Sequence, residues 1–321
     1  MAGSYLLMLA IPIGIFLIML AVFPEITLNN LPSLFKQSLF PTVLSCGLMF
    51  NFACGNWDLA IGSEAVLSAI VAGRISVSLG LGLPGIILGS ILIGALCGCV
   101  SGGMYYLTRI PTIIVTVGLL FLYECLGSIL SGGSGINISS TGYVVLGIYP
   151  WNLIYGIAAM AVAWFLLYRT RFGYQVRAVG SDGRIAMTNG IKAVKVKSLC
   201  LVISGGFAGA YAAASLCSTG IMVATTQMGT LNTAFDAMMS YLVGKALSFG
   251  KNNLVISMFV GSFCMQIIKL LLLVLGIPTA FTNACIAVLI LVLMSLTGNP
   301  ELGAAIKRLV HRGGESACTA E

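Results

Sequence analysis

Charge is scarce in this sequence of 321 residues: only 8% of them are Asp, Glu, Lys or Arg, whereas 59% are hydrophobic. That composition leaves too little polar surface to cover a soluble globule of this length, so most of the apolar surface must face lipid. We therefore predict an all-α, polytopic membrane protein.

Catalytic groups are also lacking. The only histidine, His311, lies in a basic tail where a solvated role is expected, and no nucleophile, base and orienting group form a triad. A phosphate-binding P-loop is excluded, because Gly244 and Lys245 are followed by Ala246 and the position of the loop's first glycine holds Met239. We expect no catalysis and no cofactor, and ATP hydrolysis would belong to another chain.

Cysteine is present, but not in a pattern that suggests disulfides or metal. Nine of the ten cysteines, from Cys46 to Cys285, lie in or beside apolar runs, where a thiol packs as a small hydrophobe. The C-x-C pair Cys97 and Cys99 has no histidine nearby. We therefore predict no metal site.

Long apolar runs are abundant, and seven have clear bilayer-spanning length. They cover residues 5–23, 84–107, 110–131, 151–168, 199–217, 253–275 and 278–297. Three weaker candidates, 38–54, 59–79 and 235–249, are interrupted by polar residues such as Glu64 and Asp236. No basic segment precedes the first run, so we expect a retained span rather than a signal peptide. The predicted total is about ten transmembrane helices.

The basic residues give an orientation. An even number of spans places both termini on one side, and the positive-inside rule makes that side cytoplasmic. Thirteen basic residues then lie at inner segments or inner span ends: Arg109, Arg169, Arg171, Arg177, Arg184, Lys192, Lys195, Lys197, Lys245, Lys251, Lys307, Arg308 and Arg312. Three lie elsewhere: Lys36, Arg74 and Lys269. We predict a multi-pass plasma-membrane protein with cytoplasmic termini.

The segment 169–197 holds seven of the sixteen basic residues and is predicted to be the largest cytoplasmic loop. Within it, Asp182 is placed to cap a helix of about six residues that Gly190 would stop. A short capped helix between two spans is a rigid knob on which another protein can push or pull. The alternative is a basic loop that faces lipid headgroups.

Three segments resemble the permease subunits of ATP-binding cassette importers for ribose, other sugars, nucleosides and branched-chain amino acids. The segment "GLMFNFACGNWDLAIGSEAVLSA" (47–69) is similar to an aspartate-leucine-serine-x-glycine-serine motif, with Ala60 where serine is usual. The segment "RIPTIIVTVG" (109–118) is similar to a proline-led entry into a span. The segment 169–197 resembles the family's coupling segment.

The resemblance implies one transmembrane permease domain over 1–321, with ATP hydrolysed by a separate nucleotide-binding subunit. It also implies a second permease of the same or a different chain and an extracytoplasmic solute-binding protein, in a bacterial inner membrane; no nucleic acid is expected. The ATPase-coupling residues would be Gly180, Asp182, Ile185, Ala186, Met187 and Gly190. The solute would be a sugar or a sugar-like molecule.

One departure from the family pattern follows Asp236. A glycine-rich loop is usual there, whereas this chain reads "LVGKALSFGKNN" and has Lys245 and Lys251 among the glycines. The cytoplasmic contact expected at this loop is therefore in question. Pairing with a different second permease and a lineage difference both account for it.

Ionisable residues at bilayer depth need a partner or a wet cavity, and Asp58, Glu64, Glu124 and Lys269 are candidates for the translocation path, with Asp236 also in a span. Glu124 and Lys269 lie about 21 to 24 Å from the cytoplasmic ends of their spans. Either they pair with each other, or one of them extends to the outer interface or pairs elsewhere. Asp58 either lies near the path or caps the third span.

Two other functions compete with the importer permease. A secondary transporter would use an intramembrane carboxylate such as Glu124 as an ion or proton relay. A membrane-embedded enzyme is disfavoured, because no catalytic constellation is present.

Overall fold

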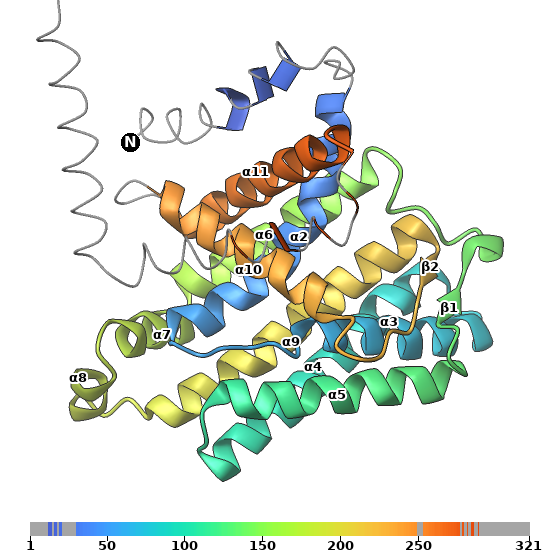
Figure 1. Ribbon diagram of the computed structural model, residues 1–321. Helices are drawn as coiled ribbons and strands as arrows, with labels where there is room; N and C mark the ends of the chain where they lie inside the picture. Colours follow the sequence, from blue (N-terminus) through green and yellow to red (C-terminus); the bar gives the residue numbers. More distant parts are fainter. Residues whose placement is uncertain are drawn as a thin grey trace, which may run out of the picture.

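A computed structural model describes residues 12–14, 16–17, 19–20, 30–248, 253–276, 278, 281, 284–285 and 288. Helices dominate this part of the chain (Figure 1), as predicted. They are α2 (Asn30–Ala53), α3 (Ile61–Ser78), α4 (Gly82–Thr108), α5 (Thr112–Ser131), α6 (Trp151–Arg169), α7 (Arg171–Ser181), α8 (Gly183–Thr188), α9 (Ala193–Thr219), α10 (Leu231–Leu247) and α11 (Leu254–Val274). Two-residue strands β1 (Ile136–Asn137) and β2 (Ile221–Met222) pair antiparallel, and a 3-10 turn covers Ser139–Thr141.

Six of these helices, α3, α4, α5, α6, α9 and α11, are long and apolar enough to cross a membrane. The chain is a polytopic membrane protein. The other two helices at predicted spans are α2, which contains Pro41, and α10, which has only 17 residues. Eight predicted spans thus coincide with described helices, although α2 and α9 begin several residues earlier than predicted. The predicted spans 5–23 and 278–297 lie mostly outside the described residues.

Glycines bring α4 and α9 into backbone contact. Gly94, Gly98 and Gly102 recur every fourth residue on α4 and face α9. A Cβ at Gly98 would lie 2.7 Å from the carbonyl oxygen of Leu201, and one at Gly102 would lie 2.6 Å from that of Ser198. Because lipid gives helices no hydrophobic reason to associate, such close packing is a main source of their attraction.

The core lies where α9 also meets α2. Phe50 and Phe207 are buried and stack with ring centroids 6.1 Å apart. With α4 on one face and α2 on another, α9 is the central helix of the described fold.

The basic segment after α6 is more ordered than predicted. The short helix is confirmed as α8, but residues 171–181, for which only a loop was expected, form α7. The hydroxyl of Thr170 accepts a hydrogen bond from Gly173 N at 3.1 Å and so caps α7, while Val176 and Val179 are buried. The prediction missed α7 because the helix is amphipathic and only 11 residues long, so it does not stand out as an apolar run.

Figure 1 shows α7 and α8 at one end of the molecule and the β1–β2 pair at the opposite end. The helix α9 joins these ends, since it begins shortly after α8 and ends just before β2. The coupling candidates in α7 and α8 therefore lie at the end of the molecule where α9 begins.

Candidate functional site

The α2–α3 connection, residues 54–60, is a break in helical structure that places Asp58 in the protein interior. Oδ2 of Asp58 accepts hydrogen bonds from Nδ2 of Asn51 and Oγ of Ser204, both at 2.9 Å. Oδ1 accepts from Ala60 N at 3.2 Å. The carboxylate thus binds the backbone at the start of α3, but the helix cap itself is Ala60. The predicted cap of the third span was therefore wrong in its residue, although Asp58 does bind the backbone beside that cap. A place for Asp58 near the translocation path stays a prediction.

The start of α5 holds the other side of the break. Trp57 N donates to Oγ1 of Thr112 at 3.0 Å, and Leu59 N donates to Oγ1 of Thr116 at 3.3 Å. Thr116 in turn donates to the carbonyl oxygen of Trp57 at 3.3 Å. Two of the segments that carry the family resemblance therefore lie against each other.

Glu64, in the first turn of α3, is fully buried. Its Oε1 accepts a hydrogen bond from Oγ of Ser101 at 2.7 Å. Its Oε2 has no hydrogen-bond partner among the described residues. Tyr123 lies next to Ser101, with the two hydroxyls 3.3 Å apart. Ser101 and Tyr123 thus bring α4 and α5 to the same carboxyl group.

Glu124, on α5, binds the loop that leads into α10. Oε2 accepts from Met228 N at 2.9 Å, while Oε1 accepts from Thr230 N at 2.9 Å and from Oγ1 of Thr230 at 2.6 Å. Gln227 and Met228 both have left-handed backbones, with φ of 61° and 62°. Such a conformation is uncommon for residues other than glycine, and here the carboxylate of Glu124 helps to hold it.

This loop reaches well inside the helical layer. Glu124 is about 18 Å along α5 from Thr112, and the carbonyl of Thr230 packs so closely on Gly62 that a side chain there would clash. The α10 helix therefore begins beside the middle of other spans, next to the α2–α3 break. Irregular backbone at membrane depth is tolerated where protein buries it or where it lines a cavity, and broken helices frequently mark transport sites.

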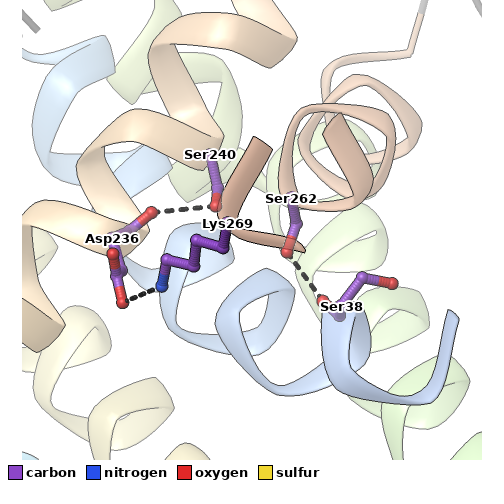
Figure 2. Close-up of polar contacts among 5 residues, drawn as sticks. All are labelled: Ser38, Asp236, Ser240, Ser262 and Lys269. Carbon is purple, nitrogen blue, oxygen red and sulfur yellow. Dashed lines mark hydrogen bonds and ion pairs between the residues drawn. The ribbon is translucent and has the colours of Figure 1, made fainter. Parts of the chain in front are cut away.

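Lys269 does not pair with Glu124. Its Nζ lies 2.5 Å from Oδ2 of Asp236, and the two side chains are 28% and 31% exposed. Figure 2 shows the Lys269 side chain pointing to the Asp236 carboxylate. The sequence-based pairing was wrong because depth along a helix does not specify direction around it. Glu124 faces the loop before α10, whereas Lys269 faces the neighbouring helix α10.

Two serines support the same region. In Figure 2, Ser240 donates to the backbone carbonyl of Asp236 at 2.9 Å, and Ser262 donates to that of Ser38 at 2.8 Å. The second bond joins α11 to α2. The Asp236–Lys269 pair is therefore part of the packing among α2, α10 and α11.

The helix α8 is built as the sequence predicted. Oδ1 of Asp182 accepts from Arg184 N at 2.7 Å and from Ile185 N at 3.2 Å. Gly190, just beyond the helix, has a φ of 80°. Ala186 is buried, whereas Ile185 and Met187 are 60% and 56% exposed. Exposed apolar residues on a capped helix offer a contact surface, and a pocket flanks each of them.

The preceding helix links α8 to the α2–α3 break. Gly180, in the last turn of α7, packs on the carbonyl oxygen of Ala53 so closely that no side chain fits there. Cys54 then donates through Sγ to the carbonyl oxygen of Val176 at 3.7 Å. Displacement of α7 would therefore reach the residues that lead to Asp58.

Sequence reasoning missed the small polar partners of these charges. Asn51, Ser101, Ser204 and Thr230 are buried, and each binds one of the flagged carboxylates. A polar residue in an otherwise apolar run was the available signal, but serine and threonine are too common in such runs to be selected on that basis.

Comparison with known proteins gives the family. The family profile described as "Branched-chain amino acid transport system / permease component" matches residues 33–294. The chain belongs to this permease family. It is the permease component of an ATP-binding cassette importer and not the ATP-hydrolysing subunit, as the sequence indicated.

The permease is similar to several curated proteins. It is 24% identical over 277 residues to the D-allose transport system permease protein AlsC of Escherichia coli K12, covering 84% of each chain. It is 26% identical to the autoinducer 2 import system permease protein LsrD of Escherichia coli O157:H7, covering 78% of each. It is 30% identical to the L-arabinose ABC transporter permease protein AraH of Azospirillum brasilense, covering 61% of this chain and 62% of that one.

Proposed function

We propose that this permease imports a sugar or a sugar-like solute. The support is the set of relatives named for D-allose, L-arabinose and autoinducer 2. The permease would form one transmembrane domain over residues 1–321, with ten spans and both termini in the cytoplasm of a bacterial cell. It would work with a nucleotide-binding ATPase, a second permease of the same or a different chain, and an extracytoplasmic solute-binding protein.

The observation that carries the coupling part of the proposal is the exposed apolar pair on α8. In this scheme the ATPase binds the exposed side chains of Ile185 and Met187, and its ATP-driven movement displaces α8 and α7. Gly180 passes the displacement to Ala53, and from there it reaches the break that holds Asp58. The path for the solute would lie near Asp58, Glu64 and Glu124, where α3 and α10 begin inside the helical layer, whereas Lys269 would hold α11 to α10.

Substitution of the α8 surface tests the coupling. Ile185→Glu or Met187→Glu should reduce recovery of the ATPase with the permease by about fivefold or more, because an apolar interface anchor is worth more than about 1 kcal/mol. Uptake driven by ATP should fall with it. The measurements are the ATPase recovered with a tagged permease and solute uptake by the same cells.

Ile185→Leu and Met187→Leu are the matched controls, since they keep an apolar side chain at the same positions. Both should retain the ATPase and uptake. Full uptake by the glutamate variants, at normal membrane levels, would contradict the coupling role of α8.

The solute class has its own test. The solute-binding protein recovered with the tagged permease should carry a sugar or a sugar-like molecule, identified by mass spectrometry after release. Recovery of an amino acid or a peptide from that protein would refute the proposed solute class while leaving the α8 coupling unaffected.

A further inference from the structure

A pocket of about 330 Å³ opens beside the α2–α3 break. The residues that matter to the argument are Asn56 and Trp57 of the break, Tyr105 and Arg109 at the end of α4, Thr112 at the start of α5, and Lys197 on α9. None of the four charged or polar candidates for the translocation path lines it. It therefore shares the α2–α3 break with the site described above but contains none of the ionisable residues proposed for the path.

The pocket is electropositive. Arg109 and Lys197 contribute two cations, and its described lining contains no carboxylate. The first helical residue of α5, Thr112, also lines it, and no side chain caps this helix. The free N–H groups and the dipole of a helix start attract an anion, so the two cations and the helix act in the same direction.

The wall of the pocket is fixed rather than incidental. Asn56 is buried and donates through Nδ2 to the carbonyl oxygen of Lys197 at 3.0 Å, which ties the break to the first turns of α9. Oδ1 of Asn56 has no hydrogen-bond partner among the described residues. Arg109 has a φ of 56°, a backbone conformation that glycine or asparagine adopts more readily. This residue is the C-cap of α4 and its backbone N–H bonds to the carbonyl oxygen of Tyr105, so the conformation ends the helix and leaves Arg109 in the wall of the pocket.

Apolar surface adjoins the opening. Ile110 and Ile113 line the pocket, and each is 42% exposed. Trp57 and Tyr105 are aromatic residues of the kind that lie at the level of lipid headgroups. The surroundings therefore suit an amphiphile with an anionic head and apolar tails.

We propose that this pocket binds the phosphate of an anionic phospholipid, with the acyl chains on the exposed apolar side chains of Ile110 and Ile113. Basic pockets between transmembrane helices are suited to such headgroups. Tyr105 and Lys197 also line a second pocket, whose wall includes Asp182 and Met187. A bound lipid would thus be a neighbour of α8.

The test is native mass spectrometry of the full-length permease in mild detergent, incubated with equimolar phosphatidylglycerol and phosphatidylcholine. The wild type should retain phosphatidylglycerol preferentially. Arg109→Asn, chosen because asparagine tolerates the left-handed backbone, and Lys197→Gln should each lower that retention about fivefold, and together about 25-fold.

Lys195→Gln is the matched control, because Lys195 is exposed on the same helix but does not line the pocket. It should retain the lipid as the wild type does, and so should the charge-preserving variant Lys197→Arg. An unchanged thermal unfolding midpoint identifies the variants that have folded. If Arg109→Asn has not folded, Arg109→Gly is the replacement, because glycine also removes the charge and adopts the left-handed backbone readily.

Three results would overturn the proposal. Equal retention of the two lipids by the wild type would remove the anionic preference. Equal losses in Lys195→Gln and Lys197→Gln would indicate a general basic surface. Displacement of the lipid by millimolar inorganic phosphate would assign the pocket to a soluble phosphorylated ligand.

Discussion

The charged side chains in the apolar interior of this permease are stabilised in different ways. Asp58 and Glu124 each accept three hydrogen bonds from side chains or backbone, whereas Lys269 forms an ion pair. Glu64 uses one carboxyl oxygen only, as far as the described residues show. Carboxylates that bind backbone N–H groups can fix irregular segments, which is where Asp58 and Glu124 are found.

The ion pair of Asp236 and Lys269 should be energetically coupled. Asp236→Asn and Lys269→Met should each destabilise the permease, because each leaves a half-buried charge without its partner. The double variant should be milder than the sum of the two by about 0.5–3 kcal/mol. A thiol-reactive dye can follow thermal unfolding, since several free cysteines are buried.

Glu124→Gln combined with Lys269→Met is the control cycle. The bonds of Glu124 go to Met228 and Thr230, so these two changes should be additive. Additivity for Asp236 and Lys269, with coupling for Glu124 and Lys269 instead, would contradict the arrangement in Figure 2.

The sequence identified the charged residues that are energetically costly inside a membrane, but it did not identify their partners. Asp58, Glu64, Glu124 and Lys269 stand out because a charge inside a span is rare. The partner of each depends on rotation about the helix axis and on which helices are neighbours, and a single sequence specifies neither. The pairing of Glu124 with Lys269 failed for this reason.

Among the helices, the α4–α9 contact depends on glycine. A Cβ at Gly98 would meet the Leu201 carbonyl, whereas a Cβ at Gly103, on the same helix, would meet nothing within 4 Å. Gly98→Ala should therefore lower stability by about 1–3 kcal/mol, as overpacking does. The measurement is the thermal unfolding midpoint in detergent.

Gly103→Ala provides the comparison, since it adds the same methyl group to the same helix. Its midpoint should stay near that of the wild type. Because alanine is a better helix former than glycine, any propensity effect at either position should raise the midpoint. Equal losses for the two variants would therefore contradict the role of the contact with α9.

Helix positions were predictable where apolar length is the dominant constraint. The ends of α3, α4, α5, α6 and α11 lie within about two residues of the predicted spans. The helix α7 was not predicted, since it is amphipathic and lies outside the spans. The spacing of Gly94, Gly98 and Gly102 could have indicated the α4 interface, but not that α9 would be the partner.

Over the whole molecule, the basic loop and the strand pair lie at opposite ends (Figure 1). The positive-inside rule predicts that the α8 end is cytoplasmic. A cysteine at Ser181 should then react with an impermeant maleimide only after the cells are opened, whereas one at Ser134 should react in intact cells. Both serines are exposed, so access to the reagent depends on sidedness alone.

The permease without an introduced cysteine is the control, because it shows how much of the labelling comes from the native cysteines. Labelling at position 181 in intact cells, or protection of position 134, would reverse or refute the topology. The same outcome would place the proposed lipid in the other leaflet, although the pocket itself would be unaffected.

The Asp236–Lys269 pair also constrains how the chain is made. A carboxylate or an ammonium at the centre of a lone helix costs about 2.5–3.5 kcal/mol during insertion by the translocon, and α10 is short as well as charged. Entry of α10 and α11 together as a hairpin lets the two charges neutralise each other before either meets lipid. We therefore expect insertion of α10 to depend on α11, the helix that the ribosome delivers after it.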